Sequence, residues 1–544
     1  MDNGFRKSMN WLHTWSGVVL GSLLFLVFWM GTLSVFDREI DTWLMPSTRI
    51  GKVESTRTVS IDRDIRPILE QQAADKPLWT ILLPEPRSPI YQLVWSAGRG
   101  SAGDEDEEHG GGIIRKRIHP QTLEFLADPE TQGASQFFYT LHHNLTIRFA
   151  HIGAWIVGFA SMAMLALIVT GVVVHRKIFV DFFTFRSRKS LGRSSLDLHN
   201  LTGVLALPFH FVITLSGLVI LFAVYFPAGY EALYPGARNA ERAMAQEVLG
   251  QVRRPKAGTP GTLASLDAMR DEAEQFWGGL PPYLLRVAHP MDANSYVVVR
   301  RTTSEDVTKN IDNIHFKGTT GEMLSHFEVK PVASVLNYIE GLHYIRFDNY
   351  LLRWLYFIAG LAGCVMIATG FIYWLEARRA SHAKSGRSGV RVVEALTVAS
   401  VLGLLIATLA FLVANRILPL GYSIGGVGRA RLEIWAFYGV WILAFVHAVW
   451  RGRAAWLEQA WATAAVSILA VLLNWITTGD HLLQSASEGL WGVAGTDLML
   501  LALAAVSGWA ALKLQANRSW AVDADRRSAA GSAEALKGVV ADVS

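Results

Sequence analysis

Two stretches of this chain follow the same pattern. Residues 12–31 read LHTWSGVVLGSLLFLVFWMG, and residues 198–217 read LHNLTGVLALPFHFVITLSG. In each stretch a Leu-His pair is followed after three residues by Gly-Val, and a second glycine ends the stretch. Both are apolar over about 20 residues, which is enough for an α-helix to cross the hydrocarbon core of a bilayer. The sequence therefore predicts two equivalent membrane helices.

A second pair of stretches repeats at a different offset. The matched positions are Trp155 and Trp354, Ala160 and Ala359, Ile168 and Ile367, and Thr170-Gly171 and Thr369-Gly370. A unit of helix, intervening segment and helix is thus present twice in the same orientation. Such an internal duplication predicts two halves related by a pseudo-two-fold axis along the membrane normal.

The composition is that of a membrane protein. Of the 544 residues, 51% are hydrophobic and 18% are charged, compared with roughly 25% charged in soluble proteins. We expect about eight spans, near residues 12–36, 152–174, 200–226, 351–375, 393–414, 432–450, 455–477 and 492–513. The last four lack the repeated motifs and are interpreted as an appended module. The expected fold class is therefore an α-helical polytopic membrane protein.

The lone cysteine, Cys364, limits the cofactors that the chain can hold. It excludes disulfides within the chain, Cys-ligated zinc or iron–sulfur sites, and c-type haem, which needs Cys-x-x-Cys-His. A dinucleotide-binding glycine motif and a Walker loop are both missing, which argues against a nicotinamide domain and an ATP motor. The net charge of +4 is small for this length, and no nucleic-acid partner is expected.

Basic residues predict the orientation, because cytoplasmic loops are enriched in Lys and Arg. They gather before the first span, between the second and third, after the fourth, and between the sixth and seventh. They are Arg6, Lys7, Arg176, Lys177, Arg186, Arg188, Lys189, Arg193, Arg378, Arg379, Lys384, Arg387, Arg391, Arg451 and Arg453. Both termini are then cytoplasmic. The outside loop 415–431 disagrees with this rule, since it carries Arg416, Arg429 and Arg431.

Two long segments, 37–140 and 227–340, fall outside, in the periplasm of a Gram-negative cell. Each has a helical stretch followed by strand-like alternation, so each is expected to form an α+β domain. The predicted helices are Ile61–Ala74 and Leu263–Phe276, and the predicted strands are Ile90–Trp95, Ile113–Ile118, Tyr283–Val287, Ser295–Arg300 and Ile311–Phe316. The acidic run Asp104–Glu108 is interpreted as a solvated hairpin loop, with metal binding as the less favoured alternative.

Of the 16 histidines, seven are the candidate site residues of the first four spans. The inner ends of the spans carry His13, His175 and His199, and the outer ends carry His142, His143 and His343. His210 follows His199 by eleven residues, which on a straight α-helix means about 16 Å along the axis and about 20° around it.

Histidines in a membrane are costly unless paired or bound, so they indicate a functional site. Histidine pairs on facing helices are the usual axial ligands of a non-covalent b-type haem. Zinc is an alternative, although the spans that carry these histidines lack carboxylates. A purely structural role, with hydrogen bonds to neighbouring helix carbonyls, is the other alternative. His447 and His481 have no partner in the repeat and are interpreted as structural.

Several motifs occur in order along the chain. They are Trp11-Leu12-His13-x3-Gly17, His175-Arg176-Lys177 with Asp181-Phe182-Phe183-Thr184-Phe185-Arg186, and Asp197-Leu198-His199-Asn200 with Leu207-Pro208-Phe209-His210. Over about residues 5–380 the chain resembles the PepSY-associated transmembrane helix proteins, often called iron-regulated membrane proteins. The resemblance implies an inner-membrane protein with PepSY-like domains outside and two haems b between the helices. It also implies reduction of ferric siderophores.

Carried over by motif, His13 and His199 correspond to the family's inner histidines. His142 or His143, together with His343, corresponds to the outer ones. The candidate iron ligands are therefore these five, and His175 and His210 are further candidate cofactor-binding residues. Which histidines pair across each haem stays open.

The expected domains follow from the spans and the resemblance. They are a first membrane helix (1–36), a first periplasmic PepSY-like domain (37–140), helices two and three with a basic loop (141–226), a second PepSY-like domain (227–340), helix four (341–380), the appended module (381–515) and a cytoplasmic tail (516–544).

The leading hypothesis is a conduit that carries electrons outward through haem to a ferric siderophore. A quinol, a cytosolic flavin carrier or a partner subunit would supply the electrons. Two alternatives remain: a non-redox binding or regulatory membrane protein, and a permease that moves the siderophore intact.

Overall fold

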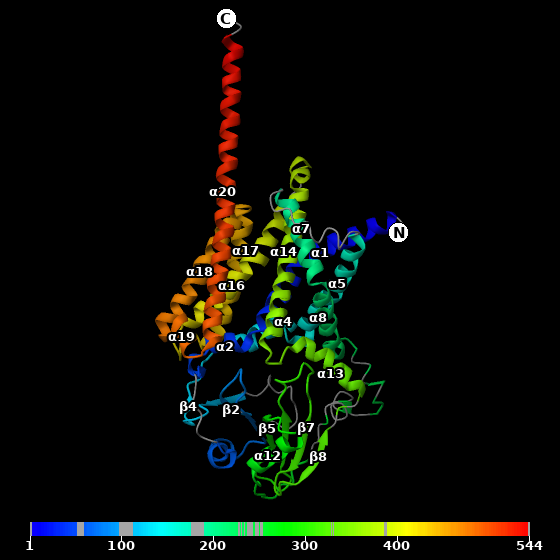
Figure 1. Ribbon diagram of the computed structural model, residues 1–544, viewed down its shortest axis with the longest axis vertical. Coiled ribbons are helices and arrows are strands. Elements are labelled where there is room, and N and C mark those ends of the chain that lie inside the picture. Colours follow the sequence, from blue (N-terminus) through cyan, green and yellow to red (C-terminus); the bar gives the residue numbers. More distant parts are fainter. Residues whose placement is uncertain are drawn as a thin grey trace.

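The computed structural model describes residues 3–51, 59–96, 113–175, 190–226, 254–327, 331–385 and 389–541, with scattered residues between 229 and 250 and Val329. The acidic run 104–108 and most of the basic loop 176–189 lie outside the described residues. Long helices form a bundle with a β-sheet at one end and both chain termini at the other (Figure 1).

Seven helices are long and apolar enough to cross a membrane, and a bent pair brings the number to eight within the described ranges. They are α1 (Asn3–Ser34), α5 (Ile152–Val174), the pair α7 (Leu191–Leu205) and α8 (Leu207–Ile220), α14 (Tyr350–Ser385), α15 to α16 (Gly389–Val398 and Leu404–Ile417, joined by the π-helix Ala399–Gly403), α17 (Arg429–Arg451), α18 (Ala454–Thr478) and α20 (Trp491–Ala541). Each predicted span coincides with one of these helices or with the bent pair. The chain is therefore a multi-pass membrane protein that requires a lipid bilayer around it.

Shorter helices connect the spans to the sheet. They are α2 (Asp37–Leu44), the π-helix η4 (Ala134–Phe138), α4 (Tyr139–Asn144), α9 (Phe222–Tyr225) and α13 (Pro331–Tyr344). A further short helix, α19 (Leu482–Ser487), joins α18 to α20.

The third span is bent by 65° between α7 and α8. Pro208 lies in the first turn of α8, and a proline within a helical run removes a backbone N–H and clashes with the preceding turn. The straight-helix estimate that linked His199 to His210 is therefore wrong, because the two residues lie on differently directed helices.

The two outside segments build one eight-stranded antiparallel sheet in the order β4-β3-β2-β1-β5-β6-β7-β8. The strands are β1 (Leu78–Leu82), β2 (Tyr91–Ser96), β3 (Ile113–Ile118), β4 (Phe125–Leu126), β5 (Pro282–Ala288), β6 (Tyr296–Arg301), β7 (Asn313–Lys317) and β8 (Met323–Phe327). The segments join where Leu78–Leu82 pairs with Leu284–Ala288. The five predicted strands are present, and β1, β4 and β8 were missed.

Two helices cover one face of this sheet. They are α3 (Arg66–Ala73), which follows the π-helix Ile61–Ile65, and α12 (Leu266–Phe276). Their apolar side chains pack on alternate strand residues, including the fully buried Trp79 and Leu285. Alternation of buried and partly exposed residues along a strand is expected when one sheet face lies on the core.

Carboxylates cap the two helical stretches reciprocally. Asp62 accepts hydrogen bonds from Ser265 Oγ (2.6 Å) and the Asp267 N–H (3.0 Å) at the start of α12. Asp267 accepts hydrogen bonds from Ser60 Oγ (2.5 Å) and the Asp62 N–H (3.1 Å) at the start of the π-helix Ile61–Ile65. Each carboxylate satisfies N–H groups that a helix N-terminus leaves unpaired. The caps therefore hold the two outside segments together.

We expect the substitution Asp62→Asn to weaken the acid dependence of stability. Burial alone would raise the pKa of the Asp62 carboxyl, but hydrogen bonds from Ser265 and the backbone outweigh burial and keep the pKa below its usual value. A depressed pKa stabilises the folded state above the unfolded pKa of about 3.9, and this stabilisation is lost as pH falls through the folded pKa.

Unfolding below about pH 4, followed by fluorescence of the buried Trp79 and Trp95, measures this effect. Asp271→Asn is the control, because Asp271 lies on the exposed side of α12 with a side chain 54% exposed. Identical acid profiles for wild type and Asp62→Asn would contradict the prediction.

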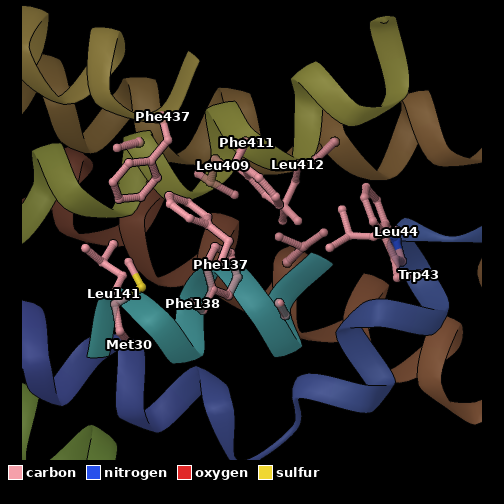
Figure 2. Packing of buried hydrophobic residues seen from close by; sticks show 14 of the residues in the cluster. Met30, Trp43, Leu44, Phe137, Phe138, Leu141, Leu409, Phe411, Leu412 and Phe437 are labelled. Atoms are coloured by element: carbon pink, nitrogen blue, oxygen red, sulfur yellow. The ribbon is translucent and has the colours of Figure 1, made fainter. Parts of the chain in front are cut away.

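A buried cluster attaches the appended module to the first half (Figure 2). Phe137 of η4 stacks on Phe411 of α16 with ring centroids 5.1 Å apart, and it meets Phe437 of α17 edge-on at 5.1 Å. Met30 of α1 and Leu141 of α4 complete the same cluster. Large aromatic side chains contribute most of the apolar area in such contacts, so the module packs firmly against α1 and α4.

Arg416 and Arg429 lie inside the protein, which explains why they disagreed with the orientation rule. Arg416 donates a hydrogen bond to the carbonyl oxygen of Trp43. The guanidinium carbon of Arg416 lies 4.3 Å from the centroid of the Trp43 ring. Arg429 donates to the carbonyl oxygen of Pro129 and lies 3.5 Å from Glu433. Because both cations are buried and have partners, they are not loop charges of the kind that the rule counts.

Candidate functional site

The histidines of the first four spans form two close pairs. His13 of α1 and His199 of α7 have ring centroids 6.3 Å apart with an interplanar angle of 81°. His142 of α4 and His343 of α13 have ring centroids 6.0 Å apart with an interplanar angle of 26°. Each pair therefore contains one histidine from the first half of the repeat and one from the second.

All four rings are held through the same nitrogen. In each case Nδ1 lies at hydrogen-bond distance from a backbone carbonyl oxygen of a facing helix. The contacts are His13 to Leu167 (3.1 Å), His199 to Met366 (2.8 Å), His142 to Val27 (2.8 Å) and His343 to Ile213 (2.9 Å). A carbonyl oxygen only accepts, so Nδ1 carries the proton and Nε2 keeps its lone pair.

Each imidazole rests on a glycine of a facing helix. A Cβ at Gly171 would lie 3.2 Å from His13, and one at Gly370 would lie 3.1 Å from His199. On the outer side, a Cβ at Gly31 would lie 2.7 Å from His142, and one at Gly217 would lie 2.8 Å from His343. The outer contacts are too close for a side chain unless the ring moves, and the inner ones are tighter than an ordinary van der Waals contact, so the glycines favour the observed ring placement. The sequence repeat aligned Gly31 with Gly217 and Gly171 with Gly370, but it did not predict that these glycines lie beneath histidine rings.

The glycines one turn after the inner histidines face neighbouring helices at different distances. A Cβ at Gly17 would lie 4.0 Å from Leu167, an ordinary van der Waals contact, whereas one at Gly203 would lie 3.2 Å from the sulfur of Met366. Gly203 therefore lies in the closer helix contact.

The centroid separation within each pair would suit two imidazoles that hold one metal ion. A metal–imidazole bond is about 2 Å long and the nitrogen lies about 1 Å from its ring centre, so two opposed ligands place their centroids about 6 Å apart. Metal-binding histidines commonly donate their other N–H to a backbone carbonyl, as all four do here. Both observations agree with a bis-histidine site.

Each histidine pair offers two protein ligands. Among the described residues, no group of three or more His, Cys, Asp or Glu side chains could hold a metal ion. A structural zinc site needs four protein ligands and a catalytic one needs three. A haem needs only its axial ligands from the protein, so a histidine pair suffices.

The two pairs lie at different depths of the bundle. Val27, which receives the His142 hydrogen bond, is fourteen residues from His13 along α1. At 1.5 Å per residue this separates the layers by about 20 Å. The outer pair lies toward the sheet, since α4 and α13 are at that end of the bundle (Figure 1).

His143 points away from the outer pair. Its Nδ1 donates to the Tyr139 carbonyl of its own helix (2.8 Å). Its Nε2 is 3.0 Å from the side-chain nitrogen of Asn144. Because both ring nitrogens have protein partners, His142 and not His143 is the better ligand candidate.

His175 and His210 lie near the pairs without joining them. His175 caps α5, and its backbone N–H donates to Gly171, the glycine beneath His13 (3.0 Å). His210 is 1% exposed, and its Nε2 is 3.2 Å from the Ala359 carbonyl oxygen. Because a carbonyl oxygen only accepts, the proton of His210 is on Nε2. In the paired histidines Nε2 instead keeps its lone pair. His210 therefore resembles a helix-packing histidine.

The two unmatched histidines have local partners. His447 Nε2 lies 3.0 Å from Glu458, and the side chain of His481 accepts a hydrogen bond from the Gln484 N–H at the start of α19 (3.3 Å). These contacts agree with the structural roles inferred from the sequence.

Comparisons with known proteins agree with the resemblance. The sequence pattern of a family described as the PepSY-associated TM region matches residues 10–377. The chain is also similar to an uncharacterised protein of Pseudomonas aeruginosa, with 25% identity over 366 residues that cover 64% of this chain and 89% of that protein. The four histidines of the two pairs all fall within the family match.

Proposed function

Because the chain belongs to the PepSY-associated transmembrane family, we propose that it is a haem b-containing oxidoreductase of the bacterial inner membrane. It would pass electrons outward to a periplasmic ferric siderophore and release iron. The observation that carries this proposal is the pair of bis-histidine arrangements, His13 with His199 and His142 with His343, at two depths of the bundle.

The protein's part in this chemistry is to hold and orient ligands. A bound b-type haem supplies a one-electron Fe(III)/Fe(II) couple. The backbone carbonyls of Leu167 and Val27 fix the tautomer of His13 and His142, and the glycines beneath the rings fix their position.

Matched contacts support the proposed internal duplication. The partners Leu167 and Met366 follow the offset found between the second and fourth spans, and Val27 and Ile213 follow the offset between the first and third. The reciprocal Asp62 and Asp267 caps agree with a two-fold relation between the outside segments. We infer two PepSY-like units that share one sheet.

The proposed direction of electron flow is from the cytoplasm to the periplasm. Loop charges favour cytoplasmic termini, and the sheet lies at the opposite end of the bundle. A quinol or a reduced flavin carrier would lose one electron at the inner side for each Fe(III) reduced outside. Reduction weakens the complex, because the hard oxygen ligands of siderophores prefer the more highly charged Fe(III).

A liposome assay tests this proposal. Haem-loaded protein is reconstituted in liposomes that enclose dithionite, and a ferric siderophore is added outside together with a colorimetric ferrous chelator. We expect ferrous iron to appear outside only when the protein is present. If the pre-reduced haems are not reoxidised by any ferric siderophore, the reductase proposal is wrong.

The alternative proposals are a non-redox binding or regulatory protein and a siderophore permease. Both predict a colourless purified protein without haem by mass analysis. A b-type absorption band would show that the protein binds haem, which neither alternative includes.

A further inference from the structure

The two helices that carry the outer histidine pair are held by different parts of the protein. His142 is on α4, and the preceding η4 packs through Phe137 against Phe411 of the appended module. His343 is on α13, which also contacts the β6–β7 connection of the sheet, residues 302–312. One ring of the pair is therefore supported by membrane helices alone, and the other is supported by the outside sheet as well.

The β6–β7 connection meets α13 through Lys309. The Lys309 backbone N–H donates a hydrogen bond to the Asn337 carbonyl oxygen (2.9 Å), and Lys309 Nζ forms an ion pair with Glu340 (2.7 Å). Nζ also lies 5.3 Å from the centroid of the Tyr344 ring. Asn337, Glu340 and Tyr344 share one face of α13, because three and four residues separate them. A single lysine thus contacts two turns of that face.

Gly341 allows the backbone of the connection to approach the same helix closely. A Cβ built at Gly341 would overlap the carbonyl oxygen of Val307 and would lie 2.5 Å from the Lys309 nitrogen. Any side chain at this position would require the connection or the helix to move. The contact between α13 and the connection is therefore a close backbone contact in addition to an ion pair.

Ion pairs close the connection at its base. Arg301, the last residue of β6, pairs with Asp306 (2.7 Å) and with Asp312 (3.3 Å). Asp306 also accepts a hydrogen bond from the side-chain nitrogen of Asn310 (3.0 Å). The Arg301 side chain is 15% exposed, and partly buried pairs are screened less by salt than exposed ones. These bonds hold Lys309 at a defined place relative to the sheet.

His343 lies on an adjoining face of α13. It precedes Tyr344 by one residue, so its side chain projects about 100° away from that of Tyr344. There its Nδ1 lies 2.9 Å from the Ile213 carbonyl oxygen and 3.1 Å from Ser216 Oγ. A helix moves as a unit over one turn, so a displacement at Gly341 also displaces His343. Since metal–ligand distances vary by only about 0.2 Å, small displacements of this helix matter for a histidine pair.

We propose that Lys309 and Gly341 are positioning residues for the outer histidine pair, which is complete only while the β6–β7 connection is docked on α13. The proposal rests on the proposed function for what the pair holds, but the placement of His343 can be measured without haem. It makes the outer pair, and not the inner pair, sensitive to the position of the outside sheet.

Histidine modification in the haem-free, full-length protein tests this placement. Diethyl pyrocarbonate acylates accessible imidazole nitrogens, and mass spectrometry gives the rate at each histidine. Lys309→Gln should raise the rate at His343 about threefold, as expected when a partly exposed ion pair is lost and the helix opens locally. Gly341→Ala should also raise it. The rates at His13 and His199 should not change.

Two further lysine variants are the controls. Lys309→Arg keeps the cation and should restore the wild-type rate at His343. Lys76→Gln removes another lysine of the outside segments, one that pairs with its sequence neighbour Asp75 (3.1 Å), and should leave the rate at His343 unchanged.

Electron paramagnetic resonance of the haem-loaded protein gives a second readout. In Lys309→Gln we expect the g values of the outer low-spin haem to shift while those of the inner haem stay the same. A lysine that only stabilised the fold would lower the unfolding temperature without this selective shift.

The proposal is overturned if His343 reacts at the same rate in wild type, Lys309→Gln and Gly341→Ala. A rise at all histidines alike would also overturn it, because it would indicate general unfolding. If Gly341→Ala does not fold, the comparison of Lys309→Gln with Lys309→Arg still decides. A wild-type protein without haem would disprove the reductase, whereas the modification rates would still decide the placement of His343.

Discussion

Replacing His142 by alanine is expected to remove one of the two proposed haems, whereas His143→Ala should leave both. His142 has its ring centroid 6.0 Å from that of His343, and its Nδ1 is held by the Val27 carbonyl, while both nitrogens of His143 already have partners. The proposed outer haem would then have His343 as its single histidine ligand, which would weaken its binding. The haem content should fall from about two to about one per chain.

Absorption spectra and haem quantitation on purified variants measure this difference. His343→Ala should reproduce His142→Ala, and His13→Ala or His199→Ala should instead affect the inner haem. The adjacent His143 is the matched control, since it is the same residue type on the same short helix. Equal haem loss in the His142 and His143 variants, or no loss in either, would remove the outer site.

The second large effect is expected from Glu433→Ala. Glu433 is fully buried and accepts hydrogen bonds from Thr131 and Asn415. It also lies 3.5 Å from the buried Arg429. Its removal leaves a buried cation and two polar groups uncompensated, which costs about 3–5 kcal/mol. Since Thr131 belongs to the first outside segment, the appended module should also detach more readily from it.

Thermal unfolding in detergent and limited proteolysis near residues 129–131 measure the loss. Glu433→Gln keeps the shape and part of the hydrogen bonding, so its effect should be smaller. Glu458→Ala removes the exposed ion pair with Arg451 and should cost less than about 1 kcal/mol. If all three variants unfold at the same temperature, the Glu433 network does not stabilise the module.

The membrane spans could be predicted because each depends on a local property. A run of about 20 apolar residues is costly in water wherever it occurs, so hydropathy locates it without knowledge of its neighbours. The third span was only partly predicted. Pro208 was visible in the sequence, but the size of the bend depends on how α8 packs, and this placed His210 away from the line through His199.

The outside segments show the same limit. Strands β2, β3, β5, β6 and β7 have clear alternation or β-branched runs, whereas β4 has two residues and β8 lacks a regular pattern. The pairing of β1 with β5 joins residues more than 200 positions apart. No local pattern encodes such a contact, so the two expected domains could not be recognised as sharing one sheet.

The amino-acid sequence by itself determined the spans, the repeat, the family and the set of candidate histidines, because these follow from composition and from residue spacing along the chain. Only the tertiary structure decided which of His142 and His143 faces His343, which glycine lies beneath each ring, and that the two outside segments share one sheet. The physical reason is that these relations depend on distances between helices and strands remote in sequence. Those distances arise only when side chains pack.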